Sequence, residues 1–290
     1  MKPPSGAPLA PGLYVVSTPS GNLRDLTCRA LDVLTAADLV LAEDTRVTAK
    51  LLNAYDLSKK VERYDDHAGE RVRPKVMALL AEGGRVALVS DAGTPLVSDP
   101  GYRLVREAID AGYAVIPIPG ASAALAALAV AGLPTDRFLF AGFTPVKSGP
   151  RRAMFEELAG VRSTLVFYET GPRLADSLAD MLAVFGPREA AVARELTKLY
   201  ETVVRGPLDA LAVDSRLQGP KGEIVVLVAP GRETAAAPED ADRALTEALA
   251  RLKPADAASE VAKALGLPRR DLYRRALTLK EEAQIEEGKK

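Results

Sequence analysis

The sequence is poor in the residues that most often build disulfides and metal sites. It has one cysteine, one histidine and no tryptophan in 290 residues. A single cysteine excludes a disulfide within the chain and suits a reducing compartment. With only one histidine beside it, the sequence offers no Cys/His cluster, so we expect no metal site.

Strong charge and long apolar runs are also absent. The formal net charge is -1, so a nucleic-acid partner would have to be met by a local basic patch. No apolar run approaches the roughly 20 residues that a membrane span needs, and the first residues lack the apolar core of a signal peptide. We therefore expect a cytoplasmic protein without a membrane partner.

Short β-rich runs alternate with helical patterns in the first part of the chain. The runs at 13–17, 39–43, 85–90 and 113–118 are typical of strands, and helical spacing fills the intervals. This alternation predicts an α/β fold with a largely parallel sheet and helices on both faces. We assign 12–118 to this N-terminal domain.

The rest of the chain changes character twice. Strand-like runs become more frequent over 119–230, which predicts a second α/β domain with some antiparallel neighbours. A Pro-bounded linker at 230–238 precedes three short helices at 239–280, the last two arranged like a helix-turn-helix. We expect 1–11 and 281–290 to be flexible tails.

Three loops rich in Gly, Pro, Ser and Thr follow three of the predicted strands. They span residues 17–22, 90–102 and 117–122. Open α/β sheets bind ligands at the carboxyl ends of their strands, so three such loops predict one shared crevice. Gly93 allows backbone to approach a ligand closely, and Pro95 fixes the shape of its loop. For any one loop the alternative is a plain connection, with Asp91 or Asp99 as a helix cap.

Other ligand sites are less consistent with the sequence. No G-x-G-x-x-G follows a predicted strand, which argues against a dinucleotide site. The segment 142–148 approaches a phosphate-binding loop but has Val146 where the second glycine must stand, so we interpret it as a basic loop. A Ser-His-Asp hydrolase would need His67 as its base, and a solvated turn accounts for that residue equally well.

A set of motifs resembles the tetrapyrrole methylases, and most closely the ribosomal small subunit methyltransferase I family. In chain order they are TPSGNLRDLTCRAL, AEDTR, SDAGTPLVSDPGY, PIPGASAALAALAVAGLPTDRF, FYE, ARELTK and KGE. The likeness runs from Leu13 to about Ala229, and the terminal helices are similar too. One departure is YETGPR at 168–173, where many relatives have Tyr-Glu-Ser-Pro-His-Arg. No role can be carried over for that missing histidine.

The resemblance implies a fold, a cofactor and a substrate. Two α/β domains would hold S-adenosylmethionine in the cleft between them. The substrate would be a cytidine in the decoding region of 16S rRNA, in the small ribosomal subunit, methylated on its ribose 2′-oxygen. We also expect a homodimer. The expected cofactor contacts are Pro19, Asp91, Gly93, Thr94, Pro95, Val97, Gly120, Ala121, Ser122, Tyr168 and Glu223.

Methyl transfer from a sulfonium is an in-line displacement that needs no metal and no covalent enzyme intermediate. Holding two reactants in line supplies up to about 7–11 kcal/mol of the barrier. A ribose hydroxyl is a poor nucleophile, so a general base is expected, with a contribution of about 10²–10⁴-fold. The catalytic candidates are Glu43, Asp44, Arg46, His67 and Glu195, and Asp66 is a further possible base. Asp44 has an alternative interpretation as the cap of the helix that begins near Arg46.

Basic side chains predict the RNA contacts. We assign them to Arg46, Lys147, Arg151, Arg152, Arg194, Lys198, Arg269, Arg270 and Arg274. Between Lys253 and Lys280 the basic residues outnumber the acidic ones by four, as phosphate binding requires. For the basic segment 147–152 a solvated helix start is the alternative.

Two other functions remain open at this point. A methylase of a small tetrapyrrole, such as a corrin or porphyrin precursor, would keep the fold, but a small macrocycle would not require the basic terminal helices. A ligand-sensing DNA-binding regulator would suit those helices, but it would leave the loops and AEDTR without a purpose.

Overall fold

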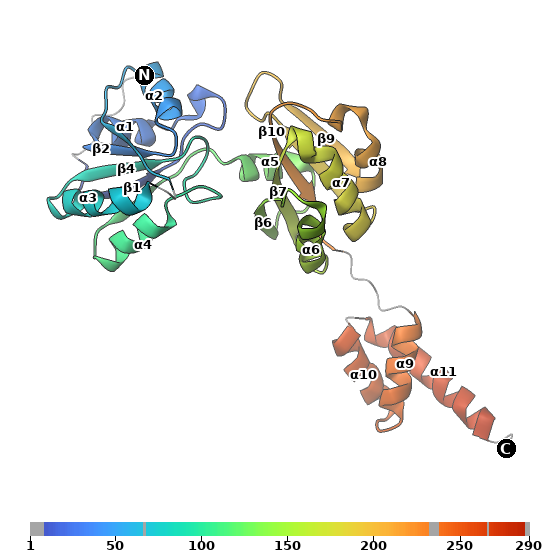
Figure 1. The fold of residues 1–290 in the computed structure, drawn as a ribbon. Coiled ribbons are helices and arrows are strands. Elements are labelled where there is room, and N and C mark those ends of the chain that lie inside the picture. The colour runs from blue at the N-terminus through green and yellow to red at the C-terminus, as the bar shows by residue number, and fades with distance from the viewer. Residues whose placement is uncertain (1–8, 66–67, 232–237, 266, 288–290) are drawn as a thin grey trace. The chain divides into compact units, whose positions relative to one another are not determined.

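The computed structural model describes residues 9–65, 68–231, 238–265 and 267–287. The chain divides into two units, Met1–Pro230 and Gly231–Lys290. The first unit contains two five-stranded sheets, and the second is helical (Figure 1). None of the described helices is both long enough and apolar enough to cross a membrane.

The N-terminal sheet is parallel throughout, with strand order β3-β2-β4-β1-β5. Its strands are β1 Gly12–Val16, β2 Leu39–Ala42, β3 Val61–Arg63, β4 Arg85–Val89 and β5 Val115–Ile118. Its helices are η1 Leu23–Asp25, α1 Cys28–Ala36, α2 Thr45–Ala54, α3 Gly69–Ala81 and α4 Tyr102–Asp110. Four strands and the parallel arrangement were predicted. The edge strand β3 was missed, because its three residues are too short to show a period of two.

Both faces of this sheet are covered by helices, as the sequence predicts. Alternate residues of a strand point to opposite faces. In β2, Leu39 and Leu41 pack in the cluster that includes side chains of α3 and α4. Val40 and Ala42 pack on the other side, with side chains of α1 and α2. This arrangement leaves the carboxyl ends of the strands, and the loops that follow them, to form a site.

The second sheet has the order β6-β7-β10-β8-β9, with β6 parallel to β7 and the other pairs antiparallel. Its strands are β6 Phe138–Phe143, β7 Thr164–Thr170, β8 Glu189–Arg194, β9 Thr202–Pro207 and β10 Glu223–Val228. Its helices are α5 Ala123–Ala131, α6 Ser148–Leu158, α7 Gly171–Phe185, α8 Leu208–Val213 and η2 Ser215–Leu217. The mixed strand directions were predicted, whereas the short helix α8 was not.

The segment 142–148, predicted as a basic loop, is a loop at residues 144–147, between the end of a strand and the start of a helix. Residues 142 and 143 complete β6, and α6 begins at Ser148, so the alternative of a helix start is correct for residues 148–152. Arg151 of this helix is only 3% exposed, and its guanidinium forms an ion pair of 2.6 Å with Asp180 of α7. The basic residue therefore packs α6 on α7.

The second unit has a core of its own. Its helices are α9 Pro238–Leu249, α10 Pro254–Leu265 and α11 Arg269–Glu287. Leu245, Val261 and Leu272, one from each helix, are among its buried residues. The predicted linker at 230–238 lies mostly outside the described residues, so its character stays a prediction.

Both predicted tails are partly wrong. Helix α11 continues to Glu287, beyond the expected end at residue 280. Near the other end, Leu9 packs against the first sheet's core, and the Tyr14 hydroxyl donates a 2.6 Å hydrogen bond to the carbonyl of Ala10. Residues 1–8 and 288–290 lie outside the described part of the chain. The predicted domain boundaries otherwise stay predictions.

Phe167 of β7 provides a test of the second sheet's core. Its side chain is fully buried, with ring centroids 5.4 Å from Phe155 and 6.5 Å from Phe185. Phe167→Ala should lower the free energy of unfolding by about 3–5 kcal/mol, because the cavity left behind adds to the lost transfer energy. Phe138 of the neighbouring strand is 44% exposed, and Phe138→Ala should cost less than about 1 kcal/mol. Urea unfolding followed by circular dichroism measures both, and equal losses would contradict the assignment of the core.

Candidate active site

The three Gly/Pro loops follow β1, β4 and β5, which are neighbours in the sheet, and they are hydrogen-bonded to one another. The N–H of Thr18 donates to the carbonyl of Gly93 at 2.8 Å, and the N–H of Gly93 donates back to Thr18 at 3.0 Å. The Ser17 and Thr94 hydroxyls lie 3.0 Å apart, and Thr94 donates to the carbonyl of Ala121 at 3.3 Å. The predicted gathering of the loops is therefore present.

A cavity of about 320 Å³ lies against these loops and is completed by residues of the second sheet. This volume lies in the range of small-molecule sites. Seven predicted cofactor contacts line it: Asp91, Gly93, Thr94, Val97, Ser122, Tyr168 and Glu223. An adjoining cavity of about 410 Å³, which shares Ser20 and Ser122 with the first, is lined by Gly120 and Ala121. Pro19 and Pro95 line neither, so the structure does not support them as contacts.

Backbone conformation is unusual at two points of the cavity wall. Leu96 and Ser98 have φ angles of +73° and +65°, and Val97 between them lines the cavity. Glu195 and Thr197, at +50° and +67°, flank Leu196, which also lines it. Such angles are costly for residues other than glycine and gather at functional sites. The strained backbone therefore makes this cavity the candidate functional site of the unit.

Comparison with known proteins identifies the family. The sequence model described as Tetrapyrrole (Corrin/Porphyrin) Methylases matches residues 12–212, and the RsmI C-terminal HTH domain matches residues 235–280. The chain belongs to the tetrapyrrole methylase family. The second match agrees with the helix-turn-helix predicted for the terminal helices.

Relatives similar over nearly the whole chain place it within one branch of the tetrapyrrole methylases. "Ribosomal RNA small subunit methyltransferase I" of Mesorhizobium japonicum is 52% identical over 276 residues, 94% of each chain. The protein of the same name from Erythrobacter litoralis is 55% identical, over 95% of this chain and 98% of its own. A solved uroporphyrin-III-C-methyltransferase from Thermus thermophilus is 23% identical, with a TM-score of 0.53, over 74% of this chain and 93% of its own. This last likeness shows the fold.

Tetrapyrrole methylases use S-adenosylmethionine as methyl donor, and the cavities of this chain fit such a group. Within the described residues, the hydroxyls of Ser20 and Thr197 and one Asp25 oxygen are buried without a hydrogen-bond partner. All three residues line the adjoining cavity, and Ser20 lines the main one too. Unpaired buried polar atoms are costly, and the amine, carboxylate and hydroxyls of the cofactor are suitable partners. Main-chain atoms can approach the cofactor closely at Gly93, whose φ is +75°.

Tyr168 forms part of the wall that β7 contributes. Its ring packs edge-on against Phe140 at 4.8 Å and against Phe143 at 5.3 Å. Burial raises the pKa of the Tyr168 hydroxyl, and the negative charges of Asp99 and Glu223 raise it further. The hydroxyl therefore stays protonated. It lies near the carboxylates of Asp99, in the loop after β4, and of Glu223, in β10.

The next residue, Glu169, was not singled out from the sequence although it belongs to the FYE motif. Its carboxylate is 2% exposed and accepts hydrogen bonds from the Thr144 and Ser177 hydroxyls and, at 2.5 Å, from Arg173. Arg173 is the last residue of the divergent YETGPR segment. This buried network fixes the β7–α7 junction at the edge of the cavity, which Glu169 also lines.

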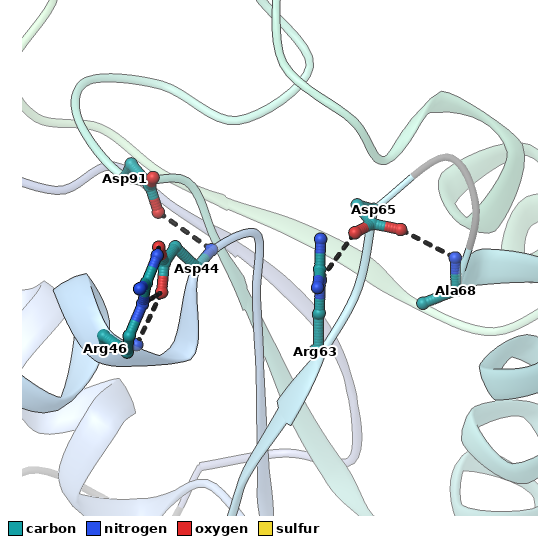
Figure 2. A network of polar contacts seen from close by, with 6 residues as sticks. All are labelled: Asp44, Arg46, Arg63, Asp65, Ala68 and Asp91. Atoms are coloured by element: carbon teal, nitrogen blue, oxygen red, sulfur yellow. Dashed lines mark hydrogen bonds and ion pairs between the residues drawn. The ribbon is translucent and has the colours of Figure 1, made fainter.

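The AEDTR segment joins the site through Asp91 (Figure 2). The N–H of Asp44 donates to the Asp91 carboxylate at 3.0 Å. The Asp44 carboxylate accepts from the N–H of Arg46 at 2.8 Å, which caps α2, and it forms a 2.5 Å ion pair with the Arg46 guanidinium. This pairing holds the pKa of Asp44 well below its usual range. The contacts support the capping interpretation of Asp44 and weaken its candidacy as a base.

The structure also argues against Glu195 as the base. Its carboxylate accepts from the N–H of Glu223 at 3.0 Å and from Lys198 Nζ at 2.9 Å. The backbone N–H of Glu223, followed by Lys198, lowers the pKa of Glu195. A Cβ on Gly222 would lie 2.3 Å from the same carboxylate, so glycine permits this packing. Glu195 therefore has a structural role in joining β8 to β10.

The other catalytic candidates stay predictions. Glu43 has polar contacts of its own and directly precedes Asp44, the cap of α2. His67 and Asp66 lie outside the described residues. Among the described residues, no group of three or more His, Cys, Asp or Glu is arranged to hold a metal ion.

The predicted RNA contacts differ in accessibility. The prediction for Arg151 is wrong, because burial and its ion pair with Asp180 withdraw it from the surface. Lys198 is only 27% exposed and is shared between Glu195 and Glu223, and Arg194 is half-buried and donates to the carbonyl of Lys221 at 2.6 Å. The exposed members of the set are Arg46, Lys147, Arg152, Arg269, Arg270 and Arg274. These six stay predictions for the RNA surface.

Ser20 tests the fit of the cofactor. Ser20→Ala should weaken S-adenosylmethionine binding by about 5–10-fold, since one hydrogen bond contributes roughly 1 kcal/mol. The melting temperature should hold, because the hydroxyl has no partner in the structure. Titration calorimetry measures the affinity, with Ser148→Ala on α6 as the control. A lower melting temperature with unchanged affinity would show that Ser20 is structural.

Proposed function

We propose that this S-adenosylmethionine-dependent methyltransferase methylates the ribose 2′-oxygen of a cytidine in the decoding region of 16S rRNA. The observation that carries the proposal is the end-to-end match with relatives named for small-subunit ribosomal RNA, at 52% and 55% identity. The match includes the helical unit, which a methylase of a small tetrapyrrole would not require. We further propose that the protein acts on the small ribosomal subunit, in the cytoplasm, and as a homodimer.

The chemistry assigned to the site is mainly positioning. When bound, S-adenosylmethionine supplies an electrophilic methyl group on a sulfonium. The three loops and the ends of β7, β8 and β10 would hold it, with Gly93 providing close main-chain contact and Tyr168 an apolar wall. Fixing a ribose hydroxyl in line with that methyl group accounts for up to about 7–11 kcal/mol of catalysis. A site built from loops and backbone is suited to this task.

The helical unit would contribute RNA contacts through one surface rather than through its net charge. Over residues 238–287 the sequence has nine Lys and Arg against eleven Asp and Glu. The excess of positive charge between Lys253 and Lys280 is therefore local. At the start of α11, Arg269 and Arg270 are both exposed, while Arg274 is exposed but paired with Asp271 at 2.8 Å. Phosphate binding at a helix start would also benefit from the helix dipole.

Transfer of a labelled methyl group tests the proposal directly. Purified protein and tritiated S-adenosylmethionine are incubated with small ribosomal subunits, with a tetrapyrrole precursor and duplex DNA as parallel substrates. The label should enter 16S rRNA alone, and nuclease digestion should release 2′-O-methylcytidine, identified by mass spectrometry. Label in the tetrapyrrole, or on a cytosine base, would overturn the proposed substrate.

The salt dependence of RNA binding tests the role of α11. Replacing Arg269 and Arg270 together with alanine should reduce the slope of log K against log salt by about two units, because each phosphate contact contributes roughly one. The matched control is Arg251→Ala in the same unit, where Arg251 is paired with Glu260 and should leave the slope unchanged. An unaltered slope in the double variant would mean that this helix start does not contact phosphates.

A further inference from the structure

The segment that joins β8 to β9, residues 195–201, is held in a fixed shape by its own polar contacts. Lys198 Nζ donates to the Glu195 carboxylate at 2.9 Å, and the N–H of Thr197 donates to the Glu201 carboxylate at 2.7 Å. Glu195 and Thr197 also have the positive φ angles described above. Strain of this kind persists only where surrounding contacts enforce it, and it gathers at functional segments.

The same segment exposes two large apolar side chains in succession, Leu199 and Tyr200, which we call the apolar pair. Leu199 is 88% exposed, more than any other large apolar side chain among the described residues, and Tyr200 is 67% exposed. Burial of apolar surface is what folding gains from such side chains, and here it is forgone. Contact with another molecule would account for both the fixed backbone and the exposed pair.

The apolar pair lies at the edge of the site. Leu196 and Thr197, a few residues earlier in the same segment, line the adjoining cavity of about 410 Å³. A Cβ on Gly21 would lie 2.4 Å from Lys198 Cγ, so the first of the Gly/Pro loops is in contact with this segment. A molecule that binds the pair is therefore placed beside the cofactor site.

The surroundings of the apolar pair are suited to a nucleic acid. The two stretches of chain that contact this segment each carry an exposed cation, Arg24 in η1 and Lys221 just before β10. The carboxylates of Glu195 and Glu223 are both paired with Lys198. An exposed aromatic ring is a surface on which a base stacks, and apolar side chains can insert between neighbouring bases.

We propose that the apolar pair is a wedge for the substrate RNA. Tyr200 stacks on a base next to the target cytidine, and Leu199 fills the gap that the target base leaves in its stack. The proposal rests on the proposed function and adds to it the step that brings one nucleotide to the cofactor.

A fixed loop is what such a wedge requires. A nucleotide that enters an enclosed site must give up stacking on its neighbours. Side chains that are already in place replace part of that stacking without a further ordering cost in the protein. The polar contacts of the segment therefore serve the wedge, and Leu199 and Tyr200 are positioning residues that touch the RNA away from the reacting atoms.

Replacing Tyr200 separates stacking from other contacts. Tyr200→Leu keeps an apolar side chain but loses the flat ring, so affinity for small ribosomal subunits should fall about tenfold, whereas Tyr200→Phe should stay within about twofold of the wild type. The salt dependence should not change, because no charge is removed. Filter binding of labelled subunits in the presence of S-adenosylhomocysteine measures both quantities.

Replacing Leu199 tests the insertion step. In single-turnover assays with saturating protein, Leu199→Ala should slow methylation about tenfold, while affinity for S-adenosylhomocysteine changes less than about twofold. Leu199→Met keeps the volume of the side chain and should react like the wild type. The matched control is Val213→Ala, at an 80% exposed apolar residue at the end of α8, which should leave the rate unchanged.

Photo-crosslinking identifies what lies against the pair. p-Benzoylphenylalanine introduced in place of Tyr200 should crosslink to 16S rRNA at a nucleotide adjacent to the methylated cytidine, as mapped by primer extension. Crosslinks to a ribosomal protein, or to a second copy of this chain, would overturn the proposal, because this surface would then bind protein.

The outcomes separate this inference from the proposed function. Wild-type protein that transfers no methyl group to 16S rRNA would overturn the proposed function. An active wild type, with Tyr200→Leu and Leu199→Ala both within about twofold of it in affinity and rate, would overturn the wedge alone. A lower melting temperature together with lost affinity for S-adenosylhomocysteine would overturn it too, because the pair would then support the cavity.

Discussion

The pair of backbone hydrogen bonds between Thr18 and Gly93 fixes the geometry on which the site depends. It joins the loops after β1 and β4 directly beyond the sheet, where regular pairing has ended. Thr94 then reaches the third loop through Ala121. Gly93 reaches this position with a left-handed backbone, which costs glycine little. The cofactor wall is therefore formed by main chain held in place before any ligand arrives.

The walls of the cavity contain strained backbone and buried polar atoms without hydrogen-bond partners, both of which lower the stability of the fold. Four non-glycine residues with positive φ flank Val97 and Leu196, and buried hydroxyls of Ser20 and Thr197 lack partners. Each such feature costs on the order of 1–3 kcal/mol. The hydrophobic cores of both sheets offset these costs, because their aliphatic and aromatic side chains are almost completely buried. A ligand that satisfies the unpaired atoms would recover part of this energy as affinity.

The sequence predicted the elements that depend on local patterns. Buried apolar runs identified β1, β2, β4 and β5, and loop composition identified the edge of the sheet where the cavity lies. Long-range pairing could not be seen in this way. The sequence predicted a surface charge at Arg151 because it does not reveal the ion pair with Asp180, which lies 29 residues away. It suggested a catalytic role for Glu195 because it does not reveal the hydrogen bond that this carboxylate accepts from the N–H of Glu223 on another strand.

The fold of this chain is shared with a solved enzyme named for a small macrocycle, whereas its relatives over nearly the whole chain are named for ribosomal RNA. The uroporphyrin methyltransferase from Thermus thermophilus matches 74% of this chain, whereas the rRNA methyltransferase relatives from Mesorhizobium japonicum and Erythrobacter litoralis match 94% and 95% of it. A macromolecular substrate needs contacts far from the reacting atom, because its phosphates bind over a wide surface. It also needs a narrow entry, because a single nucleotide must leave its neighbours to react. A helical unit with exposed arginines would meet the first of these needs.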